Sequence, residues 1–122
     1  MQYHCLIYFD PRVVFANTPE ARALHASLPE KVEQLKSSGN LVAMYPLNLP
    51  SEAMTVQKRD GKLATTDGPF METKDILGGL VVIEARDMND AIRIAGDLPH
   101  ATLGHVEVRP AIDYSKPRPQ LA

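Results

Sequence analysis

The amino-acid sequence predicts an α+β fold in which one antiparallel β-sheet carries two helices on one face. Several short segments alternate apolar and polar residues at period two, and two longer segments have helical spacing behind N-cap signals. These segments follow one another in the order β, α, β, β-hairpin, β, α, β. With right-handed crossovers, that order closes most simply as a ferredoxin-like βαβ(ββ)βαβ sheet.

The first half of the chain supplies a strand, a helix and an edge strand. Residues 2–10 place Tyr3, Cys5, Ile7 and Phe9 on one side of a strand. A helix begins at the cap Thr18, and Pro29 inside its pattern predicts a kink or two short helices that meet near Ser27. The next apolar segment, residues 41–49, contains a proline, which favours an edge position or a bulge.

The second half supplies a hairpin, a central strand, a helix and a last strand. Asp60-Gly61 between two alternating segments predicts a type I′ hairpin turn. Residues 76–85 are apolar on both faces, which is typical of a central strand. A second helix begins at Asp87 and ends before Pro99, and residues 104–110 form the last strand. The first strand should then lie between the last strand and the strand that begins at residue 76.

Length and charge limit the classes of protein that are possible. The 122 residues fit one domain, which we place at residues 1–112; the polar, proline-containing residues 113–122 are expected to be extended or disordered. With 13 basic and 15 acidic residues the net charge is −2, so nucleic acid is not an expected partner. No apolar run approaches the roughly 20 residues that cross a bilayer. One cysteine and no export signal predict a cytoplasmic protein.

The helix-free face of the predicted sheet combines apolar and titratable side chains. Such a face would be exposed to solvent in a monomer, and exposed apolar patches usually mark an interface. We therefore expect a second copy of the chain to cover it as a homodimer. The residues expected on this face are His4, Leu6, Tyr8, Gly78 or Gly79, His105, Glu107 and Arg109.

One motif links the sequence to a known family. Residues 66–74 read Thr-Asp-Gly-Pro-Phe-Met-Glu-Thr-Lys, and residues 77–79 and 106–110 flank this motif at matching spacing. Together they resemble the YCII-related proteins, specifically the subgroup named for its Asp-Gly-Pro-Phe core. The resemblance spans residues 2–111 and implies a dimeric α+β barrel. It also implies an active-site pair, which we place at His25 and Asp97, although each is shifted by about one turn or one residue from the family pattern.

Further candidate site residues come from the motif and from the helix-free face. Asp67 is either a turn residue or a general base, and Phe70 could plug a pocket. Glu72 and Lys74 could bind substrate or form a surface ion pair. His105 could act as an acid or base with Arg109 as an anion clamp, His4 and Tyr8 nearby, or the same residues could form a subunit-interface network. No ligand spacing in the sequence predicts a metal site.

Two functions follow from these residues. The first is a cofactor-independent enzyme that performs lyase, isomerase or dehalogenase-like acid–base chemistry on a small polar or aromatic molecule in a cleft of the dimer. The second is a non-catalytic ligand-binding or regulatory module, since relatives with the motif are similar to domains associated with extracytoplasmic-function sigma factors. A monooxygenase for polycyclic substrates ranks last, because the chain has no Trp and three Phe.

Overall fold

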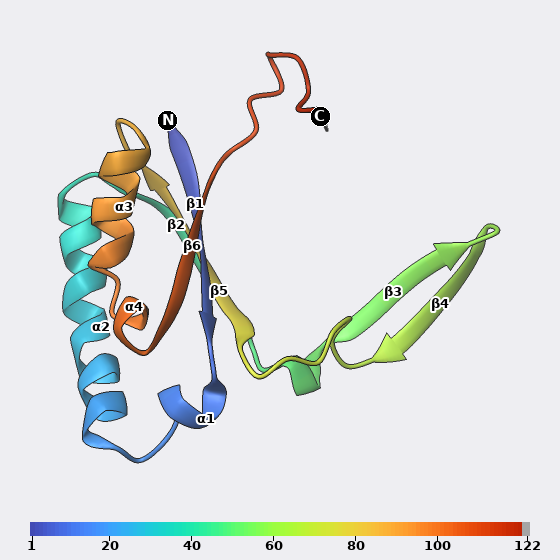
Figure 1. The fold of residues 1–122 in the computed structure, drawn as a ribbon, viewed down its shortest axis with the longest axis horizontal. Coiled ribbons are helices and arrows are strands. Elements are labelled where there is room, and N and C mark those ends of the chain that lie inside the picture. Colours follow the sequence, from blue (N-terminus) through green and yellow to red (C-terminus); the bar gives the residue numbers. More distant parts are fainter. Residues whose placement is uncertain (121–122) are drawn as a thin grey trace.

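The computed structural model describes residues 1–120 and confirms the α+β fold. A four-stranded antiparallel sheet has the order β2-β5-β1-β6, and β3 and β4 form a separate hairpin. The helices lie on one face of the sheet, and the hairpin extends away from it (Figure 1). The elements are β1 (Gln2–Phe9), α1 (Pro11–Val14), α2 (Pro19–Ser37), β2 (Leu41–Pro46), η1 (Pro50–Glu52), β3 (Met54–Arg59), β4 (Lys62–Asp67), β5 (Ile76–Glu84), α3 (Met88–Gly96), α4 (His100–Leu103) and β6 (Gly104–Pro110).

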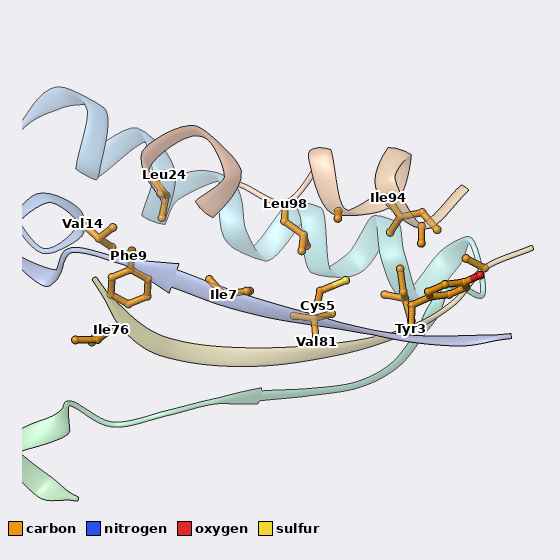
Figure 2. Close-up of a cluster of buried hydrophobic side chains, with 14 residues drawn as sticks. Tyr3, Cys5, Ile7, Phe9, Val14, Leu24, Ile76, Val81, Ile94 and Leu98 are labelled. Carbon is orange, nitrogen blue, oxygen red and sulfur yellow. The ribbon is translucent and has the colours of Figure 1, made fainter. Parts of the chain in front are cut away.

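Strand β1 lies at the centre of the sheet between β5 and β6, as predicted. Its alternate side chains, from Tyr3 to Phe9, are at most 7% exposed and form the core with the helices, as Figure 2 shows. The intervening side chains, His4, Leu6 and Tyr8, are only half-buried because no helix covers their face. The core therefore lies between one face of the sheet and the helices, and the opposite face is open in the single chain.

The helix N-termini form as the cap residues predict. Thr18 accepts a hydrogen bond from the Ala21 N–H at 3.2 Å, and Asp87 accepts one from the Asp90 N–H at 2.8 Å. Of the two alternatives for the first long helix, the pair of short helices is wrong, since α2 runs as one helix through Pro29, and the kink stays a prediction. A proline ring removes one intrahelical bond, whereas the apolar stripe of α2 packs against the core on both sides of it.

The β3–β4 hairpin has the predicted turn but does not join the main sheet. Asp60 and Gly61 have φ values of 51° and 74°, the pair of positive values that a type I′ turn requires. All six residues of β4 are exposed. The hairpin is tied at its base by Gly68, whose N–H donates to the Ala53 carbonyl at 2.8 Å.

The two glycines of β5 do not lie where the sequence placed them. The register between β1 and β5 shifts between Ile7 and Tyr8, and this bulge turns Gly78 toward the core. A Cβ at Gly78 would overlap the ring of Phe9, and one at Gly79 would lie 3.3 Å from the Tyr45 carbonyl oxygen. The helix-free face of β5 is instead formed by Leu77, Leu80 and Val82, which lie opposite Tyr8, Leu6 and His4.

Strand β2 and the C-terminal residues form one edge and the end of the described fold. Strand β2, which ends at Pro46, is an edge strand as predicted. Residues 113–120 contain no helix or strand, and the rest of the predicted tail, 121 and 122, lies outside the described residues. Within residues 1–120, none of the helices has the length and apolar character needed to cross a bilayer.

Candidate functional site

An apolar cavity of about 320 Å³ lies between α2 and the half of the sheet formed by β5 and β2. None of its lining residues is acidic, and three of them, Lys31, Tyr45 and His100, have polar side-chain groups. Tyr45 pairs with Leu80 and therefore directs its side chain to the helix-free face, so Lys31 and His100 remain as the polar groups of the cavity side. The lining residues are Ile7, Phe9, Phe15, Leu28, Lys31, Val32, Leu35, Met44, Tyr45, Pro46, Leu47, Gly78, Gly79, Leu80, Val81, Leu98, Pro99 and His100.

Four aromatic rings form a row at one end of this cavity, and three of them, Phe9, Phe15 and His100, line it. His100 stacks on Phe9 with ring centroids 5.5 Å apart, and Phe9 meets Phe15 edge to face at 5.7 Å. Phe15 in turn stacks on His25 at 5.7 Å. The absence of a side chain at Gly78 makes room for the Phe9 ring at the centre of this row. The row, which we call the ring cluster (His25, Phe15, Phe9 and His100), connects two imidazoles through two phenylalanine rings, of which Phe9 is buried and Phe15 is exposed.

His100 is poised to accept a proton at neutral pH. Burial, and to a lesser degree the nearby His25, lower the pKa of His100 below its ordinary value of 6.5. The imidazole is therefore neutral at pH 7 and has a free acceptor nitrogen. A neutral imidazole at the wall of an apolar cavity can act as a general base.

His25 has a fixed orientation. Its Nε2 lies 3.0 Å from the carbonyl oxygen of Val14. Because a carbonyl oxygen only accepts, Nε2 of His25 is the donor in this hydrogen bond. His25 thus connects α2 to the end of α1 and holds Phe15 in the ring cluster.

Among residues 1–120, Asp97 makes neither a hydrogen bond nor an ion pair with His25. It caps the C-terminus of α3 and lines a separate groove between α2 and the α3–α4 segment, together with Glu20 and Lys31. The structure places His100, three residues later, beside the ring cluster instead. The inserted Leu98 is buried in the core, which directs the chain so that His100 rather than Asp97 reaches the cavity.

A second group of polar side chains lies on the helix-free face. His105 is opposite Tyr8, and its Nδ1 is 3.8 Å from an oxygen of Asp75. These three residues line an open depression with Glu107. Lys74 also approaches Asp75, at 3.9 Å. Sequence reasoning missed Asp75, although its place directly before β5 puts it beside the end of β1.

The other residues of that face lie further along the sheet. The prediction that His105 lies next to His4 is wrong, because the strand register pairs His4 with Arg109. Arg109 lies 3.9 Å from Glu107. His105, Arg109 and Glu107 are exposed in the single chain. They form a polar strip along β6 that is separate from the apolar cavity on the other face of the sheet.

The motif residues lie apart from both groups. Asp67 ends β4 at the base of the hairpin and is exposed, as is Glu72. The expected Glu72–Lys74 pair is replaced by the contact of Lys74 with Asp75. Phe70 is 78% exposed, so the prediction that it plugs a pocket is wrong in the single chain. Gly68 has a φ of 97° and is not extended, which explains the glycine at this position.

Two buried titratable groups of the described residues, Cys5 and Asp90, are not suited to a catalytic role. Cys5 is buried, as predicted, and burial raises the pKa of its thiol to about 11, so it is not nucleophilic at neutral pH. Asp90 is buried between Arg86 and Arg93, whose hydrogen bonds lower its pKa. Among residues 1–120, no three His, Cys, Asp or Glu side chains gather closely enough to hold a metal ion.

The comparisons with known proteins agree with this fold. Residues 1–115 match the model of the YCII-related domain. An uncharacterized protein of Rhizobium meliloti is 31% identical over 117 residues, which cover 93% of this chain and 94% of that protein. The fold is similar to that of 5-chloro-2-hydroxyhydroquinone dehydrochlorinase from Burkholderia phenoliruptrix in complex with 2,5-dihydroxybenzoquinone. That match has a TM-score of 0.54 and 15% identity, and covers 92% of this chain and 94% of the other. This chain therefore belongs to the YCII-related domain family.

Proposed function

We propose that this protein is a cofactor-independent enzyme that binds a small aromatic molecule in the apolar cavity and transfers a proton through His100. The observation that carries this proposal is a neutral, half-buried imidazole at the wall of a mostly apolar cavity of about 320 Å³. That volume suits a single substituted ring. The similar fold of a dehydrochlorinase bound to a dihydroxybenzoquinone supports the same class of ligand.

The proposed chemistry needs only a base and a binding site. In a dehalogenase-like elimination, His100 takes a proton from the substrate, the freed electron pair forms a double bond, and the halide leaves with its own bonding pair. Lyase and isomerase steps begin with the same proton transfer. No oxidant or reductant is consumed, so the chain's own residues suffice.

In this proposal His25 is a positioning residue. It fixes Phe15, which packs on Phe9, the ring that stacks on His100. His25 is thus the part of the family pair that we retain, and His100 takes the place of Asp97. Asp67, His105 and Arg109 remain alternative site residues, which a second subunit could bring together with Glu72, Lys74, His4 and Tyr8.

Blocking the cavity should abolish binding of the ligand. Val32 lines the cavity from α2, and a Val32→Trp variant fills it, whereas Gln34→Trp adds the same ring on the exposed part of that helix. Calorimetric titration with 2,5-dihydroxybenzoquinone should give at least about tenfold weaker binding for Val32→Trp and unchanged binding for Gln34→Trp. Equal binding by both variants would place the ligand elsewhere. Binding by the wild type without turnover of any halogenated or hydroxylated ring would favour the regulatory module.

We also propose that the chain is a homodimer of the Asp-Gly-Pro-Phe subgroup, closed through its helix-free face into an α+β barrel. That face presents half-buried Leu6, Tyr8 and Leu80, and Leu77 is 38% exposed. A continuous apolar surface of this kind is uncommon on monomers.

Sedimentation equilibrium should therefore give twice 13.5 kDa, or 27 kDa, at micromolar concentration. Leu77→Glu places a charge on the helix-free face and should shift the protein to a monomer. Ile92→Glu changes an exposed apolar residue of α3 on the other side and should not. A wild-type mass of 13.5 kDa would contradict both the dimer and the barrel.

A further inference from the structure

Lys31 is the cation of α2 that borders the apolar cavity, and it is half-buried. It also lines the neighbouring groove, so its side chain lies at the boundary between the two hollows. A lysine in such a place packs its methylene stem along apolar surface and keeps the ammonium at the rim. The mouth of the cavity therefore carries a positive charge.

No acidic group neutralises Lys31. Within residues 1–120 it makes no ion pair at 4.0 Å or less, although Glu20 and Asp97 also line the neighbouring groove. Its neighbours three and four positions away on the helix are Ser27, Leu28, Gln34 and Leu35, so an intrahelical pair cannot form. Lys36 on the same helix differs, because its Nζ lies 3.6 Å from Glu33.

From this arrangement we propose that Lys31 selects ligands that carry a negative charge on the ring, such as phenolates, enolates or aryl carboxylates. This inference rests on the proposed function of the cavity and names the ligand class it takes. The apolar walls and Phe9 accommodate the ring, and the ammonium of Lys31 pairs with the anionic oxygen at the rim. No acidic residue lines the cavity itself, so no carboxylate of its walls repels an anion.

The same pairing assists the proton transfer. When His100 removes a proton, negative charge grows on the substrate, and a nearby ammonium stabilises that charge. An anionic oxygen held at the rim also fixes which ring atom faces His100. Lys31 is therefore a specificity-determining residue of the proposed reaction.

The experiment compares an anionic and a neutral ligand that share the same quinone ring. The anionic probe is 2,5-dihydroxybenzoquinone, which loses its acidic protons well below neutral pH, and the neutral probe is its dimethyl ether. Both are titrated calorimetrically into wild type, Lys31→Met and Lys36→Met. Methionine retains an unbranched stem without the charge, and Lys36 is the matched control because it is a lysine of the same helix outside the cavity.

Lys31→Met should weaken the anionic probe by roughly tenfold and leave the neutral one unchanged, and Lys36→Met should change neither. The wild-type preference for the anion should shrink as the salt concentration rises. Equal weakening of both probes, or none, by Lys31→Met would overturn the role of Lys31 and leave the proposed cavity function intact. If the wild type binds neither probe, the proposed function fails and this inference fails with it.

Discussion

Replacing His100 with glutamine should reduce turnover by about 10²- to 10⁴-fold, the usual cost of removing a general base. Glutamine is polar and of similar size, so it keeps the shape of the cavity wall but cannot take up a proton. Substrate binding should change much less than kcat, because the lost interaction belongs to the transition state. Steady-state kinetics with a substrate found by screening halogenated and hydroxylated rings provide the measurement.

The pH profile separates this role from a structural one. The lowered pKa of His100 means that the base is already deprotonated at pH 7, so activity should be flat above neutrality and should fall only at more acidic pH than for an ordinary histidine. His100→Gln should remove this acid limb. Asp67→Asn tests Asp67 as the alternative general base. A large loss of turnover in Asp67→Asn, together with normal turnover in His100→Gln, would contradict the proposal and indicate that Asp67 is the general base.

Removing the ring of Phe9 should destabilise the protein by about 3–5 kcal/mol, as expected for a phenylalanine truncated in a core. Phe9 is 5% exposed and contacts both Phe15 and His100. Gly78→Ala should cost about 1–3 kcal/mol on its own, because the new methyl group would overlap the same ring. Urea denaturation of each variant gives these free energies of unfolding.

The combination of the two changes is the sharper test. In the Phe9→Ala background the Gly78 methyl group enters the space that the ring has left, so the double variant should be clearly more stable than the sum of the two losses. Additivity within about 0.5 kcal/mol would show that Gly78 is present for another reason. Gly96→Ala, where an added Cβ meets nothing within 4 Å, is the control glycine.

The sequence predicts the fold well where the signal is local. Alternation fixes which side of β1 is buried, Thr18 and Asp87 mark helix starts through their caps, and Asp60-Gly61 specifies the hairpin turn. Each depends on residues within a few positions of one another. The continuous path of α2 through Pro29 could not be predicted in this way, because it depends on packing against a distant sheet.

The candidate site is less predictable because it joins distant segments. His25 and His100 are separated by 75 positions in the sequence, and their connection through Phe15 and Phe9 forms only in the folded chain. The short helix α4 was missed, since Pro99 in sequence indicates only the end of a helix. The bulge between Ile7 and Tyr8 reverses the expected side of Gly78, and no local pattern announces it.

The burial of Cys5 makes this protein well suited to site-specific chemical labelling. It is the one cysteine of the chain, and its raised pKa keeps the sulfur as an unreactive thiol at the pH of maleimide coupling. A cysteine introduced at Lys62, beside the exposed tip of the β3–β4 hairpin, would be the single accessible thiol without any need to remove the native one. In the proposed homodimer, one spin label on each copy at this site would allow the distance between the two hairpins to be measured.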